Sequence, residues 1–240
     1  MVSGTWDTSQ RDTPFQSMSI LRNGVLGKVR EAGLAGRTKK LTTVSYGILG
    51  LLGLRPHTPY ELARQFKRSG TFWASAESVV YNEPKALVAH GLATAATEAN
   101  GGRRRTRYSI TPAGRRELRR WLADPAAEPQ FQYDAMMKVL FSDLGDKDDL
   151  LGAIEAMRAW AERTQAGAAV ITHDYTTGAE PYPDRAHIVG LTQAYRVGLA
   201  QMTRQWADWA EQQVRDWPDT RSGPDPTELL TRLGEGRPPW

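Results

Sequence analysis

The sequence contains no cysteine, and this absence excludes several kinds of site at once. Without thiols the chain can form no disulfide, no thiolate zinc site and no cysteine nucleophile, and it suits a reducing cytoplasm. No stretch approaches the roughly 18 consecutive apolar residues that a membrane helix needs. Residues 1–16 also lack the apolar core of a secretion signal. We therefore expect a soluble, cytoplasmic protein without a membrane partner.

Motifs for catalysis and cofactor binding are also missing. No Gly-x-Ser-x-Gly sequence occurs, and the glycine-containing stretch 47–53 lies in a predicted helix instead of following a strand. Two acidic–histidine pairs, His173 with Asp174 and Asp184 with His187, lie in a predicted loop and at a helix start. Ordinary surface polarity explains such pairs better than metal binding. The sequence predicts no enzyme, no cofactor and no metal.

Positive charge is distributed unevenly along the 240 residues, although the net charge is only +4. Residues 1–123 hold 20 Lys and Arg against 8 Asp and Glu, whereas residues 124–240 hold 11 against 19. A basic half joined to an acidic half suggests that the first half meets a polyanion. Chance unevenness is the alternative, and the local clusters described below argue against it.

A helix is predicted from Leu41, and a second from Thr58. In the first, apolar residues recur at steps of three and four, which is typical of a buried helical stripe: Leu41, Val44, Ile48 and Leu52. In the second, Thr58 can cap the helix, Pro59 suits its first position, and Glu61 can close a capping box.

A third helix is predicted to run from a cap at Ser75 to about His90, with Gly91 after its end. Two helices joined by a short turn form a helix-turn-helix, whose second helix usually enters the DNA major groove. Pro84 interrupts the pattern, because an interior proline removes a hydrogen bond. We expect either a kink at Pro84 or a later helix start.

Short β-prone runs follow, at 92–98 and 105–110, with Asn100-Gly101-Gly102 between them as a tight turn. A hairpin placed directly after a helix-turn-helix is a wing. Its tip contains four arginines within five positions, which are Arg103, Arg104, Arg105 and Arg107. These side chains suit phosphate contacts or a narrow minor groove, and the alternative is a merely solvated hairpin.

The third helix offers a polar face opposite Val80 and Leu87, the residues expected in the core. This face consists of side chains that can contact phosphates or base edges: Ser78, Tyr81, Asn82 and Lys85. An ordinary solvated helix face is the alternative. The arginines of the neighbouring wing favour DNA binding.

The acidic half is predicted to be helical. Tyr133 to Leu144 carry one apolar stripe, Asp148 or Asp149 is expected to cap the next helix, and a loop covers 176–183. The last long helix, at about 184–217, carries apolar residues at steps close to the coiled-coil period. They are Ile188, Leu191, Tyr195, Leu199, Met202, Trp206 and Trp209. We interpret this stripe as a dimer interface, and packing within the chain is the alternative.

With these elements placed, the chain resembles the PadR-like family of bacterial transcriptional regulators. The matching segments occur in the family's order, at 41–52, 58–62, 81–92 and 107–114. Tyr81 matches a tyrosine typical of the family's recognition helix, whereas Pro84 departs from many members. The resemblance implies a homodimer held by C-terminal helices, usually a repressor, often released by a small molecule.

The resulting prediction is a mainly α protein with a small β-hairpin. It comprises a basic, partly disordered extension (1–40), a winged helix-turn-helix (41–123), a helical dimerisation domain (124–218) and a loose tail (219–240). The expected partners are double-stranded DNA, a second copy of the chain and a small-molecule effector of unknown identity. Trp160, Trp206 and Trp209 can line an effector pocket or simply pack in the core. The rival functions are a protein-interaction adaptor that does not read DNA, and an enzyme with a helical cofactor pocket.

Overall fold

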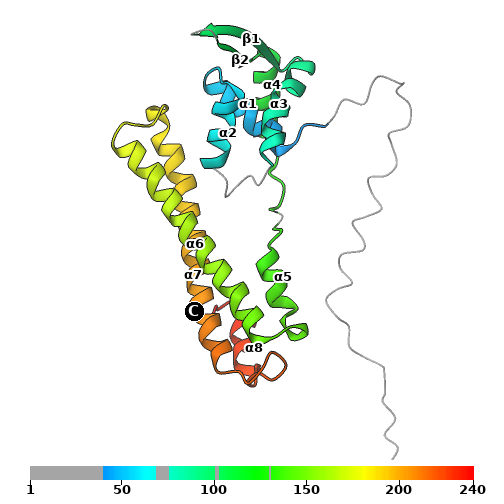
Figure 1. Cartoon of the computed structure of the whole chain (residues 1–240), viewed down its shortest axis with the longest axis vertical. Coiled ribbons are helices and arrows are strands. Elements are labelled where there is room, and N and C mark those ends of the chain that lie inside the picture. The colour runs from blue at the N-terminus through cyan, green and yellow to red at the C-terminus, as the bar shows by residue number, and fades with distance from the viewer. Residues whose placement is uncertain (1–39, 69–75, 101–102, 130) are drawn as a thin grey trace, which may run out of the picture. The chain divides into compact units, whose positions relative to one another are not determined.

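The computed structural model describes residues 40–68, 76–100, 103–129 and 131–240, and Leu41–Trp240 form one compact unit. The prediction of a basic, partly disordered extension falls on residues 1–39, which lie outside the described residues. The winged part precedes two long helices in the chain (Figure 1).

The second helix begins where its capping residue predicts, and the first begins two residues after the predicted Leu41. Helix α1 (Thr43–Leu54) has a capping box between Thr42 and Ser45. Helix α2 (Pro59–Arg68) begins after Thr58, whose backbone N–H donates to Glu61 Oε2 at 2.7 Å, while the Glu61 N–H donates to Thr58 Oγ1 at 3.3 Å. The predicted capping box is confirmed, and it satisfies N–H groups that the first helical turn leaves without partners.

Helix α3 (Glu77–Ala89) begins later than predicted. Its N-cap is Ala76, which has no side-chain acceptor, so the predicted cap at Ser75 is wrong. Pro84 lies inside the helix, where it cannot donate a backbone hydrogen bond. Its side chain is fully buried and packs in the core. The helix ends at Ala89, close to the predicted His90, and Gly91 follows the C-cap with a φ of +68°, which suits glycine.

The predicted wing is confirmed as a two-stranded antiparallel hairpin. Strand β1 (Ala93–Asn100) pairs with β2 (Arg103–Ile110) in a register that places Asn100 opposite Arg103. Both strands are longer than the β-prone runs indicated, because pairing extends to the loop. Helix α4 (Pro112–Ala123) follows and is capped by Thr111. Gly114 lies so close to the Leu92 carbonyl that a Cβ there would be 2.1 Å from its oxygen.

These elements enclose one hydrophobic core. The buried side chains come from α1, α2 and α3 and from both strands of the wing. They are Ile48, Leu49, Leu52, Leu62, Phe66, Val80, Leu87, Ala93 and Tyr108. The prediction that Val80 and Leu87 face inward is therefore confirmed.

The acidic half begins with two short helices. Helix α5 (Asp134–Leu140) and the 3₁₀ turn η2 (Ser142–Leu144) replace the single helix that the stripe from Tyr133 predicted. Their apolar side chains are exposed, with Met137 at 51% and Leu140 at 66%. Helix α6 (Lys147–Thr176) is capped by Asp146, so the predicted cap at Asp148 or Asp149 is wrong, although Asp149 completes the capping box.

Helix α6 packs along α7 (Ala186–Arg215), and the two are joined by a turn that contains η3 (Pro183–Arg185) (Figure 1). The side of α7 that packs against α6 carries mainly small residues, including Ala200, Thr203, Ala207 and Ala210. Small side chains allow two helix axes to approach closely, which leaves the larger residues of α7 on its other sides.

The tail after Pro218 is not loose as predicted. It contains helix α8 (Thr227–Gly234), and its last residue, Trp240, lies with its ring centroid 5.7 Å from that of Trp209. Thr220 also donates to the Gly145 carbonyl at 3.1 Å. The contact between these two rings and the hydrogen bond from Thr220 tie the tail to the preceding helices, although its proline and glycine content suggested a loose segment. No helix among the described residues is both long and apolar enough to cross a membrane.

Candidate nucleic-acid interface

The outer face of α3 presents the four predicted DNA-contacting residues together. Ser78, Asn82 and Lys85 are exposed and Tyr81 is half-buried. Because they lie at steps of three and four, they share one helix face, opposite the buried Val80 and Leu87. We name these four residues the recognition stripe. Their contact with DNA remains a prediction.

Asn82 is already engaged in one local hydrogen bond. Its side-chain amide donates to the Ser78 carbonyl, one turn earlier, at 2.9 Å. That bond uses one of the two N–H groups of the amide and leaves the carbonyl oxygen and the other N–H for an external partner. Asparagine with both a donor and an acceptor available suits the edge of adenine.

A buried carboxylate fixes α3 against α1. Glu83 is 5% exposed and accepts a hydrogen bond from the Ser45 hydroxyl at 2.5 Å. Ser45 belongs to the capping box of α1, so the start of α1 is linked directly to the middle of α3. Sequence reasoning missed this contact, because a glutamate in an amphipathic helix ordinarily indicates the solvent side. The bond helps to hold the recognition stripe in its orientation.

The arginines of the wing differ in the face of the hairpin on which they lie and in their exposure. In the register of the hairpin, Arg105 and Arg107 lie on the opposite face from Arg104. Arg104 and Arg105 are exposed, whereas Arg107 is half-buried. Arg103 begins β2 opposite Asn100. Arg104 and Arg105 are therefore the wing cations best placed for an external polyanion.

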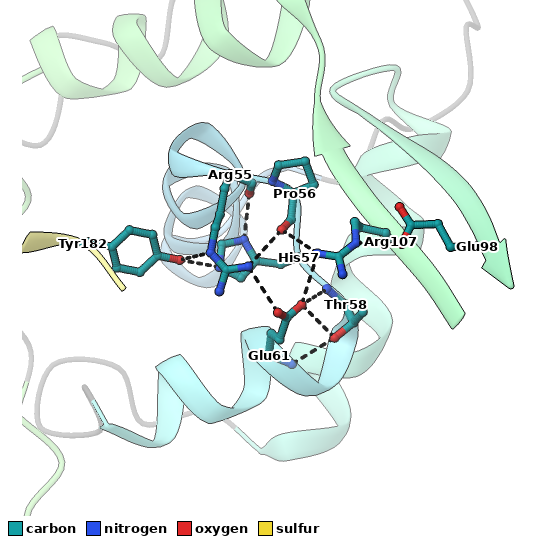
Figure 2. Close-up of polar contacts among 8 residues, drawn as sticks. All are labelled: Arg55, Pro56, His57, Thr58, Glu61, Glu98, Arg107 and Tyr182. Atoms are coloured by element: carbon teal, nitrogen blue, oxygen red, sulfur yellow. Dashed lines mark hydrogen bonds and ion pairs between the residues drawn. The ribbon is translucent and has the colours of Figure 1, made fainter. Parts of the chain in front are cut away.

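Arg107 is held within the chain. Its Nε donates to Glu98 Oε2 at 3.1 Å, and its Nη1 donates to the Pro56 carbonyl at 3.2 Å (Figure 2). The same Nη1 lies 3.7 Å from Glu61 Oε2. The prediction grouped Arg107 with the free arginines of the tip, but here it joins the wing to the start of α2. The sequence does not distinguish Arg107 from the three arginines beside it, because its partners come from distant positions.

Glu61 is the centre of that junction. It accepts from Thr58, pairs with Arg55 at 3.2 Å and faces Arg107, and we call these four residues the Glu61 cluster (Figure 2). Burial alone would raise its pKa, but hydrogen bonds from Thr58 and Arg55 outweigh that effect and hold the pKa at about 2. The carboxylate is therefore charged at every physiological pH.

We predict that Glu61→Gln weakens the winged domain and removes part of its acid sensitivity. The Glu61 pKa is lower in the folded than in the unfolded chain, so its contribution is complete above pH 4.5 and disappears as the pH falls towards 2. After allowance for solvent screening, the loss at pH 7 should be roughly 1–2 kcal/mol. Urea unfolding of both proteins at pH 7 and pH 3 measures this. Equal destabilisation of the variant at both pH values would contradict the assignment.

Helix α2 adds polar side chains that the sequence analysis did not select. Tyr60, Arg64 and Lys67 are exposed, and their steps of four and three place them on one face, away from the buried Leu62 and Phe66. The same spacing was available in the sequence.

The predicted dimerisation stripe on α7 is exposed over its first part. Leu191 is 75% exposed, Tyr195 59%, Met202 45% and Ile188 43%, whereas Leu199 is half-buried. These side chains lie away from the small residues that pack on α6. The structure therefore leaves a row of large apolar groups on this side of α7.

The tryptophans at the end of the stripe contact their own chain. Trp206 and Trp209 pack against a cluster that includes Leu150, Ile154 and Ala207. Trp160 lies with its ring centroid 6.0 Å from that of Tyr133. Trp206 and Trp209 were predicted in the dimer stripe, with an effector pocket or core packing as other uses, and the structure shows them in core packing.

Comparison of the sequence with known proteins identifies similarity to one group of regulators. The family model described as the transcriptional regulator PadR-like family matches residues 48–120. The chain is 28% identical over 164 residues to the negative transcriptional regulator PadR of Bacillus subtilis, covering 64% of this chain and 88% of that protein. It is 30% identical over 126 residues to the probable transcriptional regulator Rv1176c of Mycobacterium tuberculosis, covering 48% and 67%.

Solved structures share the fold. Bacillus subtilis PadR in complex with operator DNA superposes with a TM-score of 0.60 at 20% identity, covering 72% of this chain and 99% of that one. The same protein in complex with p-coumaric acid gives a TM-score of 0.54 at 19% identity, covering 72% and 99%. At this identity the likeness concerns the fold, which combines the winged part and the helical part in one chain.

Proposed function

This chain belongs to the PadR-like family of transcriptional regulators, and on that premise we propose that it binds operator DNA as a homodimer and represses transcription until a small-molecule effector releases it. Among its relatives, one is named a negative regulator, and one solved structure holds operator DNA. The proposal assigns DNA contact to the recognition stripe and the wing, and dimer formation to α7.

The observation that carries the proposal is the pairing of two exposed polar surfaces on neighbouring elements. The recognition stripe lies on the helix that precedes β1, and Arg104 and Arg105 project from the wing that follows. A helix in the major groove with a cationic wing beside it can combine base readout with phosphate contacts. An adaptor function would leave this arrangement of side chains without a ligand.

Dimerisation follows from the exposed part of the α7 stripe. Apolar groups such as Leu191 and Ile188 gain free energy when removed from water, at roughly 25 cal/mol per Å². A row of them along a helix offers a second copy of the same helix a matching surface. Two copies of the chain can then present two copies of α3 to successive half-sites on DNA.

An effector is proposed because a structure of Bacillus subtilis PadR holds p-coumaric acid. In this chain, a groove with a volume of 710 Å³ lies between α5, η2 and the start of α6. Its lining mixes apolar side chains, including Met137 and Phe141, with Lys138 and Asp149. That combination suits a small molecule with an apolar body and polar ends.

The experiment that tests the proposal is binding to the DNA upstream of the chain's own gene. Fluorescence anisotropy would compare that DNA with a random duplex over a range of salt concentrations. We expect preference for the upstream DNA and an affinity that falls steeply with salt. Absence of binding at low salt would refute the proposal, and equal weak binding to both duplexes would favour the adaptor.

A further inference from the structure

The turn between α6 and α7 contacts the winged part through the side chain of Tyr182. The Tyr182 hydroxyl lies 2.6 Å from His57 Nε2, and Arg55 Nε donates to it at 3.1 Å (Figure 2). The Arg55 guanidinium also lies 5.6 Å from the centre of the tyrosine ring. One hydroxyl thus meets two residues that are 125 or more positions away in the sequence.

The hydrogen-bond directions follow from the surroundings of His57. Its Nδ1 lies 2.8 Å from the Arg55 carbonyl, which can only accept, so Nδ1 carries the proton. Burial lowers the pKa of this imidazole, so it is neutral near pH 7 and Nε2 is an acceptor. The Tyr182 hydroxyl therefore donates to His57 and accepts from Arg55.

His57 contacts the wing directly, and Arg55 is connected to it through Glu61. The backbone of His57 exchanges two hydrogen bonds with Tyr108 in β2, at 3.0 and 2.8 Å. Arg55 pairs with Glu61, which faces Arg107 in the same strand. The Tyr182 hydroxyl is thus connected to the base of β2 by two routes, and β2 carries Arg104 and Arg105 towards the tip.

A second contact holds the same region at the far end of α2. Arg68 pairs with Asp174 at 2.8 Å and with the buried Glu180 at 2.9 Å. Arg196 of α7 donates to the Arg68 carbonyl at 3.2 Å. This contact fixes the end of α2 but involves neither His57 nor the wing, so it provides a natural comparison.

We propose that Tyr182 is a positioning residue for DNA binding, which orients the wing through His57 and Arg55 and so couples the α6–α7 turn to the contact of Arg104 and Arg105 with DNA. The proposal rests on the proposed function. A phenylalanine at 182 keeps the ring but leaves His57 Nε2 buried without a donor. The base of the wing then loses its anchor, while α6 and α7 keep their own packing.

The first test needs no DNA. In Tyr182→Phe, the backbone amides of His57 and Tyr108 should exchange with deuterium about tenfold faster than in the unchanged protein, because their anchor is lost. The NMR shifts of the His57 ring nitrogens should also move. The control is Tyr175→Phe near the end of α6, because Tyr175 lies close to Tyr182 but makes no hydrogen bond to His57 or Arg55. Unchanged exchange at both amides would overturn the proposal.

The second test is a double-substitution cycle on operator DNA. In the otherwise unchanged protein, Tyr182→Phe should weaken operator binding about fivefold to tenfold. In a protein whose Arg104 and Arg105 are both replaced by alanine, the same substitution should weaken binding by less than about twofold. Arg68→Met, which breaks the second contact, should show the same loss in both backgrounds. Equal losses for Tyr182→Phe in both backgrounds would overturn the proposal. If the unchanged protein lacks operator preference, the proposed function fails, and amide exchange still decides whether Tyr182 anchors the wing.

Discussion

Leu191→Glu is expected to convert the proposed dimer into a folded monomer and to reduce operator affinity at least about a hundredfold. Leu191 is 75% exposed within its own chain, so a charge there costs the protomer little. In the dimer it would bury an unpaired carboxylate in an apolar interface, which is strongly unfavourable. Loss of the second half-site contact removes the gain from bivalent binding, which typically spans about 10² to 10⁴.

The measurement combines sedimentation or light scattering with anisotropy on the operator. Leu230→Glu on α8 is the matched control, because Leu230 is 60% exposed and lies outside the α7 stripe. Circular dichroism must show unchanged helix content in both variants. A Leu191→Glu protein that remains dimeric would place the interface elsewhere, for example on the exposed side of α5.

Replacing Arg104 and Arg105 with alanine is expected to reduce the salt dependence of operator binding by about 3 to 4 in the slope of log K against log salt. Each phosphate contact contributes about 0.9 to that slope, and a dimer loses four arginines. Operator affinity near physiological salt should fall at least about a hundredfold for the same reason. Both side chains are exposed, so protein stability should be almost unchanged.

The control for this change is the pair Arg163→Ala and Arg204→Ala, which removes the same charge from exposed positions on α6 and α7. It should leave the slope nearly unchanged, because neither arginine belongs to the recognition stripe or the wing. Equal slopes for the wing variant and the unchanged protein would mean that the wing does not meet phosphates, as the adaptor hypothesis requires.

Local patterns were sufficient to predict the elements of the winged part. Thr58 and Glu61 are three residues apart, so their capping box depends only on the first turn of α2. The spacing of Val80 and Leu87 fixed the inner face of α3, and therefore which residues form the recognition stripe. Asn100 and the two glycines after it located the wing.

Patterns failed where a neighbouring segment or a packing partner decided the outcome. Serine is a good acceptor, which predicts a cap at Ser75, yet α3 begins after Ala76. The proline and glycine content of the tail predicts a loose segment, yet the rings of Trp209 and Trp240 come together across the 30 residues between them. Composition describes average preference, and an aromatic contact with a distant part of the chain can outweigh it.

The sequence by itself determined the order of helices and strands in the winged part, the polar face of α3 and the apolar stripe of α7, because each depends on residues within a few turns of one another. The tertiary structure decided which charged groups are free and which are paired. Arg107 and Arg105 are indistinguishable in sequence, but only Arg107 lies beside Pro56 and Glu61. The bonds from Tyr182 to His57 and from Ser45 to Glu83 likewise join residues 125 and 38 positions apart, and a periodic pattern carries no information about such partners.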